Sequence, residues 1–264
     1  MPTYHPSWKT FITLSGECEV YFAPILQEIM KAIKAQDPLN ENIITKCLKN
    51  IDEMFVPFRK SLKNFYGQLN SEEFYVDLRP ILCGWSHGKL KDKGLIYETS
   101  IQQVNNNTEI TESSCPFSSK GSTSDSNRRM CIGASAAQSL TIQACDAFFQ
   151  IKHHPEDEEF FKKMQTYMIT EHRQFLEDLA MYSRIRSIAV ESKSSELKSN
   201  YNQCLQSLWN FRNSHISLVN RFIIEPSKKA EAKIKQLEVT GTSGQCLKVF
   251  LQRVRDASNS ATLK

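Results

Sequence analysis

The stretch that decides the fold is Tyr201-Asn-Gln-Cys-Leu-Gln-Ser-Leu-Trp-Asn-Phe-Arg-Asn-Ser-His-Ile-Ser-Leu-Val-Asn-Arg-Phe-Ile-Ile224. Its apolar side chains recur in steps of three and four, the period of one face of an α-helix; they are Cys204, Leu208, Phe211, Leu218 and Phe222. His215 fills the gap in this row, four residues after Phe211 and three before Leu218. The spacing predicts a long helix over 195–224 with His215 pointing inward.

An inward histidine has two interpretations. It can be a core residue with a ring nitrogen hydrogen-bonded to a neighbour. It can also be an axial ligand of haem iron, because no second histidine or cysteine lies at chelating distance along the helix. Arg212, one turn earlier on nearly the same face, bears on this choice, because a guanidinium buried without an anion is costly. A haem propionate would be such an anion.

The composition favours an all-α fold and excludes several classes of function. The 264 residues are 40% hydrophobic, with only 9 glycines and 9 prolines to interrupt helices. The net charge of +4, with basic residues spread among acidic ones, argues against a nucleic-acid partner. The 8 cysteines show no metal-ligand spacing, so we expect reduced core residues in a cytoplasmic protein. No signal peptide or membrane-spanning run is recognisable.

Three further long helices are predicted from helical periodicity. The first, over 18–35, has an apolar face formed by Val20, Phe22, Ile25, Leu26, Ile29 and Met30. The second, over 41–69, is the clearest, and Pro57 should bend it because proline removes a backbone donor. The third, over 157–181, places His172 on its buried side, where we expect a core residue.

A shorter helix starts at Ser71, an expected N-cap followed by acidic residues that suit the helix dipole. Phe74, Leu78 and Ile81 share one of its faces, with Arg79 one residue round. Arg79 is then either a solvated or ion-paired surface residue, or it receives a carboxylate in a fork-like geometry.

Three other segments differ in character from these helices. We expect residues 99–130, which are polar with almost nothing to bury, to be a disordered insert within a single domain, 1–264. The small residues of 131–139 allow close approach to the backbone, either by a flat ring system or by a packed helix. The glycine-bearing loop 240–244 is either a lid or a helix cap.

Several motifs follow one another in a specific order. They are Leu-Arg-x-x-x-x-Gly-Trp at 78–85 with Phe74 before it, Gly-Ala-Ser-Ala-Ala-Gln-Ser at 133–139, Tyr-Met-Ile-Thr-Glu-His-Arg-Gln-Phe-Leu at 167–176, Arg-Asn-Ser-His at 212–215 and Gly-Thr-Ser-Gly at 241–244. The ordered set resembles the large domain of the indoleamine 2,3-dioxygenase family, and the resemblance extends over roughly 20–264 apart from the insert.

The resemblance implies an all-helical bundle that binds one haem b and adds dioxygen across the indole C2–C3 bond of L-tryptophan or a related indoleamine, giving N-formylkynurenine. His215 would be the proximal iron ligand, Arg79 would bind the substrate carboxylate, and Phe74 would pack on the indole. The other roles that it implies are Tyr75 in the substrate pocket, Ser135 and Ala136 near the haem edge, Arg212 on a haem propionate, and Gly241 and Thr242 in a loop closing on substrate.

The sequence also departs from the family pattern. The family has an N-terminal small domain that helps to cover the distal side of the haem. We expect this small domain to be missing here, and the haem therefore to be more exposed to water on its distal side. Residues 7–11 do not reproduce the aromatic-and-serine pattern of the family's first pocket helix. The alternatives to a dioxygenase are a myoglobin-like oxygen-binding haem protein and an inactive, shortened homologue. We expect a monomer that does not bind a membrane.

Overall fold

The structure is a computed structural model that describes residues 6–85, 94–96, 128–229 and 246–263. The described chain is helical apart from two short antiparallel strands, β1 (Leu95–Ile96) and β2 (Arg128–Arg129), so the all-α prediction is confirmed. The helices are α1 (Pro6–Lys34), α2 (Glu41–Ser61), α3 (Asn64–Gln68), α4 (Ser71–Glu73), η1 (Phe74–Leu78), α5 (Arg79–Leu82), η3 (Ala136–Gln138), α6 (Leu140–Phe149), α7 (Pro155–Gln165), α8 (Thr170–Tyr182), α9 (Ile185–Glu191), α10 (Ser195–Val219), η4 (Asn220–Ile224), α11 (Glu225–Ser227) and α13 (Leu247–Ser260). Most of the insert predicted over 99–130 lies outside the described residues.

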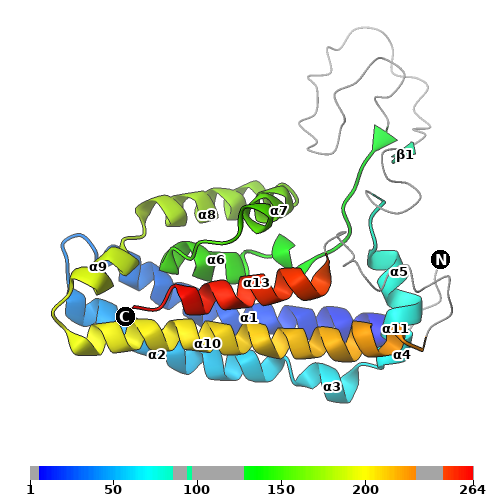
Figure 1. Ribbon diagram of the computed structural model, residues 1–264, viewed down its shortest axis with the longest axis horizontal. Helices are drawn as coiled ribbons and strands as arrows, with labels where there is room; N and C mark the ends of the chain where they lie inside the picture. Colours follow the sequence, from blue (N-terminus) through cyan, green and yellow to red (C-terminus); the bar gives the residue numbers. More distant parts are fainter. Residues whose placement is uncertain (1–5, 86–93, 97–127, 230–245, 264) are drawn as a thin grey trace, which may run out of the picture.

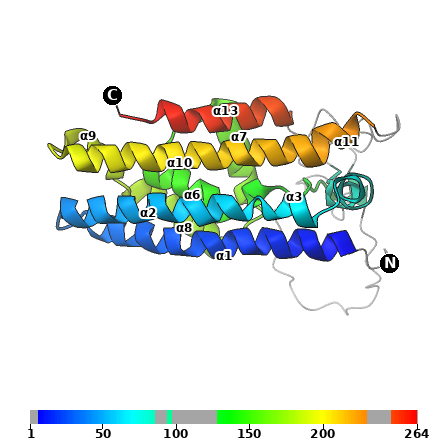
Figure 2. The same cartoon turned by 90° about the horizontal axis from the view of Figure 1, so that it is seen from below.

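The long helices form a layer in which α10 lies between α2 and α13, and α1 lies on the far side of α2 (Figure 2). Figure 1 shows α6, α7 and α8 together on one side of this layer, with α9 and α5 at its opposite ends. The core joins α2 to α10 through Phe58 and Phe211, whose rings stack with centroids 4.2 Å apart. Burial of such a side chain contributes about 1.5–3 kcal/mol.

The predicted helix over 195–224 is present as α10 followed by η4, and its apolar row is buried. The helix continues past Pro226, because α11 (Glu225–Ser227) follows η4 without a break. The π-turn η4 precedes Pro226 and accommodates a residue that has no N–H to donate.

The first helix is longer than predicted, since α1 begins at Pro6 and contains Pro24. Val20 and Met30, which were predicted to lie on its buried face, are exposed. Phe22, Ile25 and Ile29 of that predicted face are buried, since a helix covered on one side has only one narrow face to bury.

The predicted helix over 157–181 is interrupted at residues 166–169, which separate α7 from α8. The interruption resets the helical phase, so the three-and-four spacing does not carry across it. His172 consequently lies on the exposed side of the first turn of α8, and the core position predicted for it is wrong.

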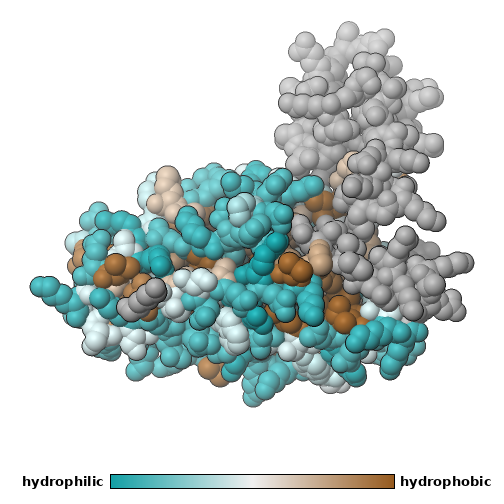
Figure 3. All heavy atoms as spheres, in the orientation of Figure 1, coloured by the Kyte–Doolittle hydropathy of each residue, from teal (hydrophilic) through white to brown (hydrophobic). Residues whose placement is uncertain are grey.

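The seven cysteines in the described ranges are free thiols. Cys47, Cys145 and Cys204 are buried, and burial raises the pKa of Cys47 to about 11, while Cys246 is exposed, contrary to the core position predicted for the cysteines. The face seen in Figure 3 is mainly hydrophilic, with small separate apolar areas. In the described part of the chain, every helix is too short or too polar to cross a membrane.

Candidate active site

One wall of the candidate site is the π-helical turn η1. Its helix is capped by Asn70, whose side chain accepts from the backbone N–H groups of Glu72 and Glu73, rather than by Ser71 as predicted. The backbone N–H of Arg79 donates to the carbonyl oxygen of Phe74, five residues earlier. Such π-turns arise where a normal helical bond cannot form and are frequent at functional sites.

Proline explains the position of this turn. Pro80 has no N–H to offer the carbonyl four residues before it, and its ring crowds that carbonyl. The second π-turn, η4, likewise ends two residues before a proline, Pro226. The two π-turns pack against each other, with the rings of Phe74 and Phe222 edge to face and their centroids 6.1 Å apart.

The π-turn decides which way Arg79 points. Its extra residue rotates the helix, so Arg79 is 0% exposed while Ile81, predicted to be buried, is 56% exposed. The alternative of a solvated Arg79 is therefore wrong. Its guanidinium lies over the ring of Tyr75, 5.4 Å from the centroid, and burial lowers the pKa of Arg79. A buried guanidinium favours an anionic partner, and a carboxylate matches its fork of donors.

The second wall is the segment of small residues, which is hydrogen-bonded to the first. Trp85 donates its backbone N–H to Cys131, with N and O 3.0 Å apart, and Ala134 donates to Leu82 at 2.9 Å. A Cβ atom at Gly84 would lie 2.2 Å from the backbone nitrogen of Gly133. Glycine at 84 therefore permits the contact that joins two motifs distant in the sequence.

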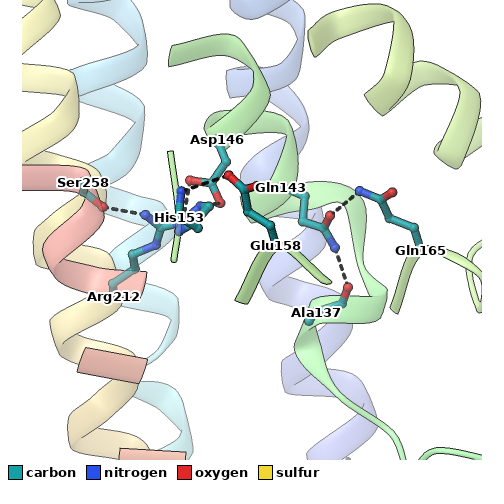
Figure 4. A network of polar contacts seen from close by, with 8 residues as sticks. All are labelled: Ala137, Gln143, Asp146, His153, Glu158, Gln165, Arg212 and Ser258. Carbon is teal, nitrogen blue, oxygen red and sulfur yellow. Dashed lines mark hydrogen bonds and ion pairs between the residues drawn. The ribbon is translucent and has the colours of Figure 1, made fainter. Parts of the chain in front are cut away.

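The turn with Ser135 and Ala136 is fixed by its own side-chain bonds. Ser135 Oγ accepts from the N–H of Ala137, and Gln138 Oε1 accepts from the N–H of Ser135. Gln143 on α6 donates its amide Nε2 to the carbonyl of Ala137 at 2.7 Å, and Gln165 on α7 donates to Gln143 (Figure 4). The turn is thus preorganised, with Ser135 half-buried and Ala136 exposed.

An aromatic residue of the stretch 7–11, whose sequence does not match the family's first pocket helix, also belongs to this site. Phe11 on α1 packs beside Phe74, with ring centroids 5.2 Å apart. Ser15 follows one turn later and donates its hydroxyl to the Phe11 carbonyl. The sequence signal for this position is the four-residue spacing of Phe11 and Ser15. Only Phe11 lies within the stretch 7–11, so that stretch alone does not show the aromatic-and-serine pattern.

His215 lies on α10 between two clusters of contacts. Arg212 is about 4.5 Å before it along the helix axis and Phe222 about 10.5 Å after it, by the rise of 1.5 Å per residue. Burial lowers the pKa of His215, and neither a charge nor a hydrogen bond from a described residue contributes to the shift. The imidazole is therefore neutral near pH 7, the form in which histidine binds a metal.

Arg212 has a protein partner that the sequence analysis did not predict. Its Nη2 donates to both carboxylate oxygens of Asp146, at 2.6 and 2.7 Å, and its Nη1 donates to Ser258 on α13. Burial alone would raise the pKa of Asp146, but the charge of Arg212 holds it below its usual value. Asp146 thus supplies an anion for the buried guanidinium without a haem propionate.

These residues nevertheless fit a haem. His215 offers a neutral imidazole, and the Nε of Arg212 is buried without a hydrogen-bond partner among the described residues. A propionate oxygen could accept from that Nε while Nη2 keeps its bonds to Asp146. Gly241 and Thr242, predicted to form a loop over the substrate, lie outside the described residues.

Comparisons with known proteins decide the family. The model of the family described as indoleamine 2,3-dioxygenase matches residues 3–261. The chain belongs to the indoleamine 2,3-dioxygenase family. Its resemblance to the family, stated above from the ordered motifs, is confirmed.

The proteins similar to this chain include some named as dioxygenases and some named as myoglobins. Indoleamine 2,3-dioxygenase 2 of Homo sapiens is 26% identical over 261 residues, which are 96% of this chain and 58% of that protein. Myoglobin of Haliotis diversicolor is 29% identical over 236 residues, 89% of this chain and 55% of that protein. 6-hydroxytryptophan 2,3-dioxygenase of Fusarium equiseti is 29% identical over 220 residues, 83% of this chain and 49% of that protein. The chain thus spans about half the length of these curated relatives.

Proposed function

We propose that the protein is a haem-dependent dioxygenase that opens the indole C2–C3 bond of L-tryptophan or a related indoleamine to give N-formylkynurenine. The observation that supports this most strongly is the burial of Arg79 beside Phe74 and Tyr75. This is an aromatic wall with one buried cation, which suits a substrate that has both an indole ring and a carboxylate.

In this proposal His215 holds the haem b iron through its neutral imidazole, and the Nε of Arg212 binds a propionate. Bound haem would supply the activation of dioxygen. The protein's own contribution is then to orient the substrate, which needs no acid–base pair of side chains. Ser135 and Ala136 would lie along the haem edge, on the turn that Gln143 holds in place.

Arg79 would fix the substrate by its carboxylate, through charge-assisted hydrogen bonds that are strong in a buried setting. Phe74 would pack on the indole, supported from behind by Phe11 and Phe222. Tyr75 would add a hydroxyl to the pocket wall.

The second candidate is an oxygen-binding haem protein without turnover, which is favoured by the similarity to a relative named myoglobin. Arg79 distinguishes the two candidates. An oxygen carrier has no amino-acid carboxylate to bind, whereas a dioxygenase of tryptophan has one, and a guanidinium matches a carboxylate in charge and geometry.

The test is to express the full chain with haem and to record its absorption spectrum. We expect a Soret band that is lost in His215→Ala and kept in His172→Ala, the control at an exposed histidine. L-tryptophan, dioxygen and reductant should then give N-formylkynurenine. A haem complex without product would select the oxygen-binding protein, and a wild-type chain without a Soret band would overturn both.

A further inference from the structure

A histidine outside the candidate site contacts the carboxylate that binds Arg212. His153, in the loop before α7, has its Nε2 3.0 Å from Oδ2 of Asp146, as Figure 4 shows. The side chains of Arg212, Asp146 and His153 are only 7%, 10% and 5% exposed. Three charged or chargeable groups from α10, α6 and this loop therefore meet in the protein interior.

The charges of this cluster balance only while haem is absent. The carboxylate of Asp146 and the guanidinium of Arg212 cancel each other. A haem propionate on Arg212 Nε, as the proposed function requires, would leave two carboxylates sharing one guanidinium. A net buried charge costs several kcal/mol, so a second cation is needed close to Asp146.

The surroundings of His153 show which group can be that cation. Asp146 faces it from α6, and Glu158 on α7 accepts from its backbone N–H at 3.4 Å. Asp146 and His153 line a cleft on the surface of the protein. The other charged groups around this cleft are Lys152 and Lys162, which are exposed, and Arg186, which donates to Tyr201 and to the carbonyl of Ala261. In the described chain, Arg212 and His153 are the cationic side chains within ion-pair distance of Asp146.

Histidine is the side chain that gains a charge near neutral pH. We propose that His153 takes up one proton from solvent when haem binds, so that Asp146 keeps a full cationic partner while Arg212 binds the propionate. His153 is thus a positioning residue for the cofactor, acting through Asp146. The inference rests on the proposed function in that it requires haem at Arg212.

The test measures protons directly. The full chain, prepared without haem, is titrated with hemin in a calorimeter at about pH 7.5, in two buffers of different ionisation enthalpy. We expect the wild type to take up about one proton more than His153→Gln. The haem affinity of the wild type, relative to that of the variant, should fall by up to tenfold for each unit increase in pH. His154→Gln is the matched control, because this neighbouring histidine is half-exposed and its ring lies near Glu156, with Nδ1 and Oε2 3.8 Å apart. It should behave as the wild type.

Equal proton uptake by the wild type and His153→Gln would overturn the inference. If His153→Gln does not fold, the ring nitrogen shifts of His153 decide instead, in the diamagnetic ferrous carbonyl complex of the wild type. An imidazolium in the complex and a neutral ring without haem support the proposal, whereas an unchanged ring contradicts it. A wild type that binds no haem refutes the proposed function, whereas haem binding and N-formylkynurenine formation with equal proton uptake refute this inference alone.

Discussion

The backbone N–H of Arg79 donates to the carbonyl oxygen of Phe74, and this five-residue bond places both side chains in the same wall of the candidate site. In an ordinary α-helix, Arg79 would be rotated away from that wall. One local irregularity of the backbone therefore links the cation proposed to bind the carboxylate to the ring proposed to bind the indole.

We expect Arg79→Gln to weaken the binding of L-tryptophan about 10- to 100-fold, because a charge-assisted hydrogen bond contributes about 1.5–3 kcal/mol. The measurement is the spectral shift of the haem complex on titration with the substrate. Tryptamine, which has the indole ring but no carboxylate, is the matched ligand, and its affinity should be the same in the wild type and the variant. If the variant lost affinity for both ligands equally, the carboxylate role of Arg79 would be wrong.

The sequence predicts some parts of this site well for a physical reason. The row of apolar residues in α10 is long and regular, so its burial follows from period alone, whereas His215 within that row is partly buried. The direction of Arg79 does not follow from it, because a π-turn shifts the phase by one residue. The exposure of His172 has a related cause, because the break between α7 and α8 also resets the helical phase.

Proline at position 80 should control the direction of Arg79. In Pro80→Ala the new N–H can bond to the carbonyl of Val76, which favours a normal α-helical turn. We expect the affinity for tryptophan to fall about tenfold or more, as it does when a charge-assisted bond is lost, while the Soret band is unchanged. Pro57→Ala is the matched control, since Pro57 lies inside a helix that contains no π-turn. Unchanged tryptophan affinity in Pro80→Ala would show that the π-turn does not depend on this proline.

Gly84→Ala tests the contact between the two walls. Its Cβ would lie 2.2 Å from Gly133 N and 2.4 Å from Cys131 O, and both are backbone atoms that cannot move aside cheaply. We expect a loss of about 1–3 kcal/mol in the free energy of unfolding, as for other overpacked sites, measured by urea denaturation.

Gly16→Ala and Gly67→Ala provide the comparison for Gly84→Ala. A Cβ at either position meets nothing within 4 Å, and both residues lie in helices. Alanine should stabilise these positions by about 0.5–1 kcal/mol, because glycine loses more conformational freedom on folding. A Gly84→Ala variant as stable as these two would mean that residues 82–85 do not pack closely on 131–134.

The cluster of Asp146, His153 and Arg212 shows a different limit of prediction. Asp146 and Arg212 are separated by 66 residues, and periodicity within one helix cannot reveal a partner on another. The available signals were local: an acidic residue in the mainly apolar helix 140–149, and an arginine on an inward face. Each indicated a buried charge in need of a partner, but only the packing of α6 against α10 identifies the pair.

The lowered pKa of His215 predicts how stability depends on pH in the chain without haem. Between the folded pKa and the usual value near 6.5, the unfolded chain binds a proton at this residue and the folded chain does not. Stability should therefore fall as the pH decreases below about 6.5, by at most about 1.4 kcal/mol per pH unit from this residue. The difference in the free energy of unfolding between the wild type and His215→Gln, followed from about pH 7.5 to 5, isolates its contribution from those of the other histidines. We expect the variant to be less sensitive to acid than the wild type, and parallel curves would show that His215 is as accessible to protons in the folded chain as in the unfolded one.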